Sequence, residues 1–107
     1  MATYVHDGEA IDYTPTADVA AGAVVVQGEL VGVTKSPIAA NKLGALAVTG
    51  VFDFPKATGS AITAGALCYW DATNQRATTT ATGNKLIGKC VKAAADVDTT
   101  VRVRMSQ

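Results

Sequence analysis

The side chains that enzymes use for catalysis are scarce in this chain. Its one histidine is His6, and it contains neither the G-x-S-x-G pattern of serine hydrolases nor the H-E-x-x-H pattern of zinc proteases. His6, Asp7 and Glu9 are candidates for a metal site, but adjacent residues on a strand point to opposite faces, which favours a solvated turn instead. Because catalysis needs titratable groups gathered in a pocket, we expect no enzyme, and no catalytic, cofactor-binding or metal site.

An excess of charge of either sign is also missing. Nine basic residues balance nine acidic ones, and only 17% of the residues are charged, which is below the usual quarter. Proteins that bind nucleic acid normally carry a basic excess that neutralises phosphates, so we expect no nucleic-acid partner. Residues 28–36 resemble a phosphate-binding loop only superficially, because Gly32 follows Gly28 after three residues and two more separate it from Lys35.

Paired cysteine motifs and long apolar runs are absent as well. Cys68 and Cys90 form no C-x-x-C motif, and we expect both to be reduced, buried thiols. The longest apolar run, residues 19–26, is too short to span a membrane. The first residues lack the basic segment and apolar run of a signal peptide, so we expect neither a signal peptide nor a membrane partner.

Strand-forming residues are abundant. Valine, isoleucine and threonine far outnumber the helix formers glutamate and leucine, and ten glycines separate the short runs. Residues 100–105 alternate strictly, which predicts a strand with its two arginines facing outward and its two valines and methionine facing inward. Residues 45–54 alternate in the same way and place Leu46, Val48, Phe52 and Phe54 on one face. Over 107 residues, this pattern predicts one all-β domain, a small β-sandwich or barrel.

The core of such a domain is expected to be thin. Alanine occurs 20 times, whereas leucine and isoleucine together number 9 and phenylalanine only 2. Small side chains bury little apolar area each, and the stabilisation scales with that area. A second subunit that extends the buried surface would therefore help this chain.

Two parts of the chain match each other in order, which indicates an internal duplication. VAAGAV at residues 19–24 returns as ITAGAL at 62–67, LVGV at 30–33 as LIGK at 86–89, and LAVT at 46–49 as VRVR at 101–104. The offset between matching segments increases after the first match, which places an insertion within 71–84 of the second copy. We predict an N-terminal arm (1–16) and two pseudo-symmetric β units (17–57 and 58–107), with residues 71–84 as a polar hairpin arm that turns near Asn74.

Aromatic residues supply the candidates for a partner interface, where they are enriched. Tyr69 and Trp70 are adjacent and must face opposite sides of a strand, so one of them is expected at an edge or interface. Tyr4, Val5 and Tyr13 belong to an N-terminal segment, residues 2–13, that is free to order on binding. These five residues form the candidate interface, and the polar hairpin arm is the rival contact.

An ordered set of motifs resembles a known family. The set consists of AGAVV at residues 21–25, LVGV at 30–33, GVFDFPK at 50–56, GALCYWD at 65–71, IGKC at 87–90 and VRVR at 101–104. It resembles a family of short bacteriophage and prophage proteins that are described as capsid decoration or cement proteins, many of which carry an older automatic label of RecA/RadA-type recombinase. The resemblance covers essentially the whole chain and implies a small β domain, commonly trimeric, on the outside of a phage head. Trp70 departs from it, because a smaller or β-branched residue is expected there.

The resemblance and the composition together predict a structural phage protein. It would decorate and stabilise the capsid as a homotrimer that binds the major capsid protein lattice, without a cofactor, on the outer capsid surface after assembly in the cytoplasm of the bacterial host. Another virion or tail protein with an adhesive β domain is the first alternative. A recombination-associated DNA-binding protein is the second, although strand exchange needs nucleotide binding and a basic DNA-contacting surface, and the sequence indicates neither.

Overall fold

The computed structural model describes residues 2–3 and 8–107, and within them it contains strands and no helix. The strands are β1 (Ala10–Tyr13), β2 (Val24–Gln27), β3 (Leu30–Val33), β4 (Gly44–Ala47), β5 (Gly50–Pro55), β6 (Leu67–Asp71), β7 (Arg76–Thr78), β8 (Lys85–Lys92) and β9 (Thr100–Met105). The predicted all-β fold is therefore confirmed. The expected alternation in β9 is present too, because every second residue from Val101 to Met105 is buried while both arginines are exposed.

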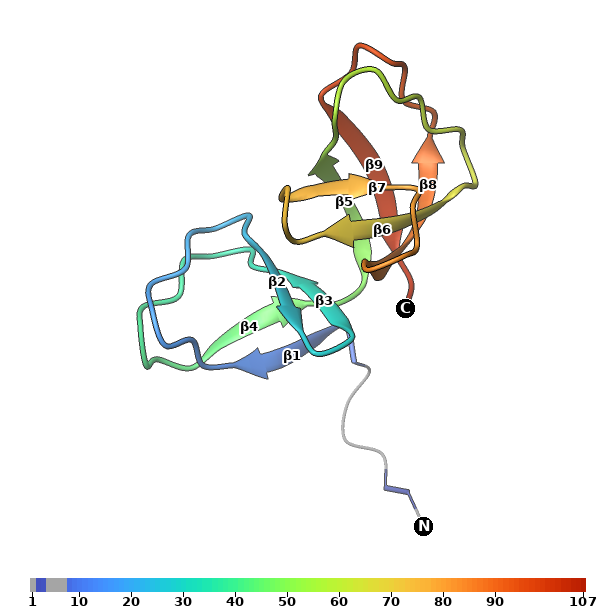
Figure 1. Cartoon of the computed structure of the whole chain (residues 1–107). Coiled ribbons are helices and arrows are strands. Elements are labelled where there is room, and N and C mark those ends of the chain that lie inside the picture. Colours follow the sequence, from blue (N-terminus) through green and yellow to red (C-terminus); the bar gives the residue numbers. More distant parts are fainter. Residues whose placement is uncertain (1, 4–7) are drawn as a thin grey trace.

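The strands form two antiparallel sheets that lie side by side (Figure 1). The first sheet has four strands in the order β1-β4-β3-β2, and the second has five in the order β5-β9-β8-β6-β7. We call residues 8–48, which contain the first sheet, the first unit, and residues 50–107, which contain the second sheet, the second unit. Strand β3 of the first unit packs against β8 of the second.

The two units have corresponding strand orders once β7 is left out. Strands β1, β4, β3 and β2 occupy the places that β5, β9, β8 and β6 occupy in the second sheet. The loops correspond as well, since the bridge between Val19 and Ile38 has a counterpart between Ile62 and Ala94. Val19 and Ile62 begin the first pair of matching sequence segments, and Ile38 and Ala94 are separated by the same offset as the second pair. The two sheets therefore share one strand order, to which β7 is added in the second.

The division between the sheets differs from the unit boundaries expected from the sequence. Strand β1 lies within the expected N-terminal arm, 1–16, and β5 lies within the expected first unit, 17–57, yet β5 belongs to the second sheet. The alternation across residues 45–54 predicts one continuous strand, but it contains two. Gly50, at a φ of 107°, adopts a backbone conformation that favours glycine, and there the chain leaves the first sheet for the second.

Residues 71–84 include the predicted hairpin turn, between β6 and β7. The chain reverses over residues 72–75, and the Asp71 carboxylate accepts hydrogen bonds from the backbone N–H groups of Thr73 and Asn74, at 3.0 and 3.2 Å. The hairpin is less polar than its sequence indicates, because Trp70 and Ala77 face each other across it and are both buried. A bridge between Lys56, directly after β5, and Ala77 joins the two edge strands of the second sheet.

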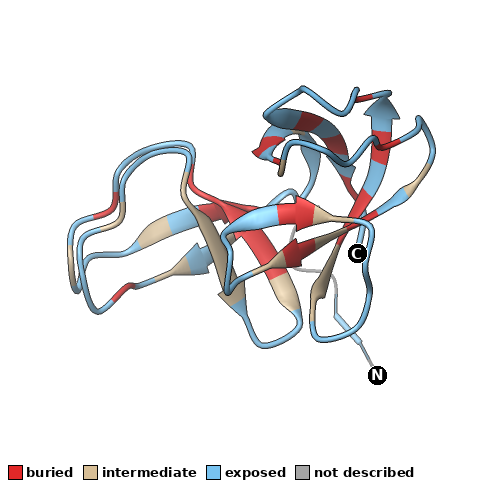
Figure 2. Ribbon diagram, turned by 45° about the horizontal axis from the view of Figure 1, so that its top comes forward, coloured by how far each residue is buried: buried red, intermediate tan, exposed pale blue. Residues whose placement is uncertain are grey.

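Buried residues are concentrated on the strands, whereas the loops are mostly exposed (Figure 2). In the second unit the rings of Phe54 and Trp70 pack 6.1 Å apart within the main core. Val31 and Val33 of the first unit belong to the same core, so the two units share it. Leu46 and Ile38 are also buried and lie on the two in-sheet glycines of the first unit, Gly32 and Gly44.

Two polar contacts also join the units. The Gln107 side-chain amide donates a hydrogen bond to the Val31 carbonyl and accepts one from the Val31 N–H, each at 2.7 Å. The amide thus satisfies backbone groups of β3 as a neighbouring strand would. At the surface, Lys85 forms an ion pair with Glu29 at 2.7 Å.

Candidate partner-binding surfaces

Among residues 2–3 and 8–107, no three His, Cys, Asp or Glu side chains are grouped so that they could hold a metal ion. His6 and Asp7, considered above as ligands together with Glu9, lie outside the described residues. No helix in the described part of the chain is long and apolar enough to cross a membrane. The surfaces that remain to be considered are those that contact other molecules.

The structure describes three of the five candidate interface residues, and these three differ in exposure. Tyr4 and Val5 lie outside the described residues, and Tyr13 is half-buried at the end of the edge strand β1. Of the adjacent aromatic pair, Tyr69 is half-buried, while Trp70 is only 3% exposed and packs on Phe54. Trp70 is therefore a core residue of this chain, and we correct its assignment to the interface. Its large side chain fills the space that β7 encloses.

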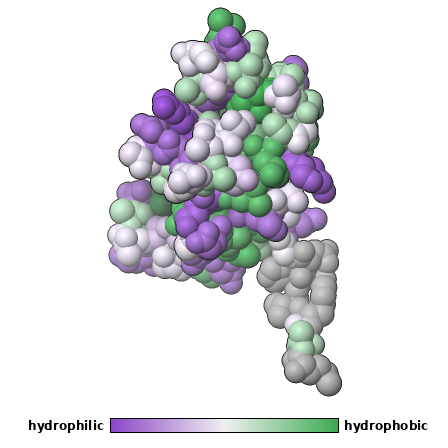
Figure 3. All heavy atoms as spheres, turned by 45° about the vertical axis from the view of Figure 1, so that its right-hand side comes forward, coloured by the Kyte–Doolittle hydropathy of each residue, from purple (hydrophilic) through white to green (hydrophobic). Residues whose placement is uncertain are grey.

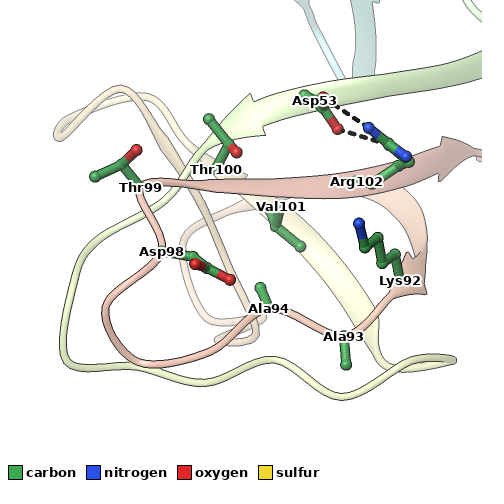
Figure 4. Close-up of a pocket in the computed structure, with 9 residues that line it drawn as sticks. All are labelled: Asp53, Lys92, Ala93, Ala94, Asp98, Thr99, Thr100, Val101 and Arg102. Atoms are coloured by element: carbon green, nitrogen blue, oxygen red, sulfur yellow. Dashed lines mark hydrogen bonds and ion pairs between the residues drawn. The ribbon is translucent and has the colours of Figure 1, made fainter.

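Each unit contains a hollow at an equivalent place in its sheet. In the second unit the hollow is about 250 Å³ and lies between Asp53 of β5, residues 92–94 and residues 98–102 (Figure 4). In the first unit it is about 300 Å³ and lies between Ala10 of β1, residues 35–38, and Gly44, Ala45 and Ala47 of β4. Ala10 pairs with Ala47 in the first sheet, as Asp53 pairs with Arg102 in the second.

The chemistry of the two hollows is opposite. In the second unit Arg102 donates two hydrogen bonds to the Asp53 carboxylate, from Nε at 3.0 Å and from Nη2 at 3.2 Å. Figure 4 shows Lys92 beside this pair. The hydrogen bond from Arg102 holds the pKa of the Asp53 carboxyl below its ordinary value. In the first unit alanines stand at both of these paired positions, so the hollow is lined mainly by apolar side chains, with Lys35 and Ser36 as its polar members.

The outer face of the second sheet carries a row of four side chains, two cations between two aliphatic residues, that sequence analysis missed. Val51 pairs with Arg104, Arg104 with Lys89, and Lys89 with Leu67, across β5, β9, β8 and β6. All four side chains are exposed. A row across four strands depends on their register, and the only signal for it in the sequence is the outward position of the arginines in β9.

Five large hydrophobic residues of the described chain are also exposed: Leu43, Val51, Leu67, Val91 and Val97. Leu43 and Val97 lie in the corresponding loops before β4 and β9, whereas Val51, Leu67 and Val91 lie on strands of the second sheet. On the side drawn in Figure 3, hydrophobic residues are interspersed with hydrophilic ones. Such a mixture is typical of protein surfaces in general, so the candidate contacts are taken from the exposed residues named above.

Both cysteines are free and buried, as the sequence predicts. Burial raises the pKa of the Cys68 thiol to about 11. Because the thiolate is the reactive form of cysteine, Cys68 is chemically unreactive near neutral pH. The thiols belong to the core and take no part in a binding surface.

Comparison with known proteins adds one finding. A family model described as phage cement protein matches residues 5–105. A search of the curated proteins gave no match. A search of the solved structures gave none either.

Proposed function

The chain belongs to the phage cement protein family, and from this premise we propose that it decorates the outside of a phage capsid by binding the major capsid protein lattice. The family is structural, which places the chain with the proteins of the virion capsid and points to a role other than catalysis. The single observation that carries the proposal is the match of the family model over nearly the whole chain, residues 5–105.

Capsid binding would stabilise the shell by mass action. A ligand that binds the assembled lattice and has no affinity for dissociated subunits stabilises the lattice by about 2.7 kcal/mol per site at a hundredfold excess over its Kd. A small β domain with low overall charge and an apolar hollow has surface suited to such a contact. The N-terminal segment, residues 2–13 with Tyr4, Val5 and Tyr13, is our candidate for the capsid contact, and the β6–β7 hairpin with Tyr69 is the rival.

The proposal includes a homotrimer that assembles on the head in the host cytoplasm and needs no cofactor. Capsid lattices offer three-fold and quasi-three-fold positions that a closed ring of three copies can match. Two buried, unpaired thiols are compatible with assembly in a reducing compartment. The small apolar side chains of the first unit also favour a form in which further surface is buried against another subunit.

Reconstitution tests this function. Expanded heads purified from phage that lack the gene are mixed with the recombinant protein, and the bound protein is measured by co-sedimentation. We expect saturable binding at a fixed number of copies per head, and a higher temperature at which the heads dissociate. Deleting residues 2–8 should weaken binding and leave the circular dichroism spectrum unchanged.

Two results would decide against parts of this proposal. Heads that do not retain the intact protein would exclude capsid decoration and favour the tail or another virion component. Full binding by the variant that lacks residues 2–8 would exclude only the assigned contact.

A further inference from the structure

We propose that the outer face of the second sheet, centred on Lys89 and Arg104, binds the first unit of a second copy of this chain, so that copies join head to tail. We call this surface, formed by Val51, Leu67, Lys89, Val91, Arg102 and Arg104, the cationic face. The proposal names the contact within the proposed homotrimer, and it rests on that part of the proposed function. It does not depend on whether the trimer binds capsids.

The first step is the unpaired charge on the cationic face. Lys89 and Arg104 are directly opposite each other on β8 and β9, and like charges in this position destabilise a sheet. Arg102, on the same face, is bonded to Asp53, whereas neither Lys89 nor Arg104 has an acidic partner among the described residues. An acidic partner surface would remove this repulsion.

The second step is the apolar border of the same face. Val51 is 53% exposed, Leu67 46% and Val91 45%. Val51 pairs with Arg104 and Leu67 with Lys89, while Val91 lies on β8 itself, two residues after Lys89 and between the residues where the register shifts. Burying aliphatic side chains is favourable in proportion to the apolar area that is removed from water. The face therefore offers both a charged centre that needs a counter-charge and apolar side chains that gain from being covered.

The third step comes from the duplication. In the first sheet Val24 pairs with Val33, and in the second Leu67 pairs with Lys89 at the equivalent positions. Val33 is only 4% exposed and Val24 packs against the shared core, so this face of the first unit is covered by the second unit. On the same face of the second unit Ile87, the equivalent of Val31, is buried, whereas Leu67 and Lys89 are exposed. The face that the first unit uses for packing is thus partly uncovered in the second unit, where Leu67 stands in place of Val24 and Lys89 in place of Val33.

The fourth step identifies the occupant. Residues 1–49 contain five acidic and two basic residues, whereas residues 50–107 contain four acidic and seven basic ones. The neutral chain is therefore divided into an acidic half and a basic half. In the first unit Glu9, Asp12 and Asp18 are exposed and form no ion pair with a described residue. They outnumber Lys35, the cation at the apolar hollow.

The acidic half also contains a hollow for the aliphatic side chains of the cationic face. Asp12 pairs with Ala45, and Ala45 lines the apolar hollow of about 300 Å³, which can receive an aliphatic side chain of the cationic face. A second copy thus supplies both carboxylates and an apolar hollow. The contact joins two different surfaces, so it repeats around a ring or along a filament, and the trimer is the ring that closes at three.

Light scattering on charge-reversal variants tests this contact. We expect the wild-type protein to have three times the chain mass, and Lys89→Glu/Arg104→Glu to have the mass of one chain. Arg76→Glu is the matched control, because Arg76 is exposed on β7 at the hairpin end of the same sheet, and it should leave the trimer intact. Adding Glu9→Lys/Asp12→Lys to the double variant should restore the trimer, and this rescue excludes misfolding as the cause of dissociation.

Binding to expanded heads is measured on the same variants to separate this proposal from the proposed function. Trimers that dissociate and are rescued as expected support the contact even if neither the wild-type protein nor any variant binds heads. In that case capsid decoration alone is excluded. A monomeric wild-type protein contradicts the contact. So does a Lys89→Glu/Arg104→Glu variant that stays trimeric, whether or not it still binds heads.

Discussion

The first and second units share a strand order and differ in one strand. In the second unit β7 lies at the end of the sheet, and its Ala77 bridges to Lys56 after β5, so the sheet curls back and encloses Phe54 and Trp70. In the first unit β1 and β2 are the edges of the sheet, and the side chains on one of its faces reach the core only by packing on the second unit. The strand added within residues 71–84 thus encloses large side chains of the second unit, and the sheet of the first unit has no counterpart to it.

This difference assigns the units different tasks. A closed sheet with large buried side chains supplies most of the apolar burial, and burial is the main favourable contribution to folding. An open sheet with uncovered edges and an apolar hollow is suited to binding, because an edge strand presents unpaired backbone groups to a partner. We therefore regard the second unit as the stable body of the protein and the first as its docking unit.

The largest expected effect is a difference in the loss of stability when equivalent residues of the two units are replaced by alanine. Phe54 pairs with Val101 in the second sheet, as Ile11 pairs with Leu46 in the first. Phe54→Ala should lower the free energy of unfolding by about 3–5 kcal/mol, because Phe54 is 1% exposed and its removal leaves a cavity. Ile11→Ala should cost about 1–2 kcal/mol, since Ile11 is half-buried. Urea denaturation followed by circular dichroism measures both, and equal losses would contradict the assignment of a stable body.

The equivalent glycines of β3 and β8 give the next comparison. A Cβ atom at Gly88 would overlap the Arg104 backbone carbonyl and lie 2.7 Å from the Ser106 nitrogen, so β9 would have to move. At Gly32 the nearest contact is the Leu46 Cβ at 2.9 Å, and that side chain is freer to adjust than a paired backbone. We expect Gly88→Ala to cost about 1–3 kcal/mol more than Gly32→Ala in thermal denaturation. The comparison fails if Gly32→Ala is the more damaging change.

A smaller loss of stability should follow from removing the contact that Gln107 makes between the units. Gln107→Ala removes both hydrogen bonds to Val31, and a typical hydrogen bond contributes about 1 kcal/mol, so the loss should be about 1–2 kcal/mol. Hydrogen exchange at the Val31 amide should accelerate most. Ser106→Ala is the control, because the Ser106 contact to Ile87 uses the backbone N–H alone. An unchanged exchange rate at Val31 would show that this amide does not join the units.

The smallest effect concerns the ion pair that distinguishes the two hollows. The hydrogen bond from Arg102 lowers the folded-state pKa of Asp53, so the pair stabilises the protein above the unfolded pKa of about 3.9 and loses its contribution as the pH falls through the folded pKa. Asp53→Asn should therefore be slightly less stable than wild type at pH 7 and equal to it near pH 2. A stability difference that grows on acidification would have the wrong sign. Because both side chains are 48% exposed, added salt should shrink the difference at pH 7.

The sequence predicts the elements with strong local signals and misses those that depend on register. The strict alternation of residues 100–105, the hairpin turn near Asn74 and the duplicated segments all follow from local patterns, and the structure contains them. The position of β5 could not be predicted, because alternation continues through Gly50 while the chain changes sheets there. The position of Trp70 beside Tyr69 makes it a candidate for the interface, and only the closure by β7 shows why it is buried.

The candidate site was less predictable than the fold. Lys89 and Arg104 are separated by a loop in the sequence, and their opposition becomes visible only when β8 and β9 are paired. The two hollows likewise depend on strands and loops that are distant in the chain. Their correspondence follows from the duplication, but their opposite chemistry rests on single residues, such as alanine at position 10 and aspartate at position 53.

Electron cryomicroscopy of expanded heads saturated with the protein tests the central claim, that this chain is a capsid cement protein, most directly. Heads prepared without the protein provide the reference map. The account predicts additional density on the outer surface at three-fold or quasi-three-fold positions, into which rings of three chains fit with the first unit of each copy against the cationic face of the next. Saturated heads whose map equals the reference, or density confined to the tail vertex, would contradict it.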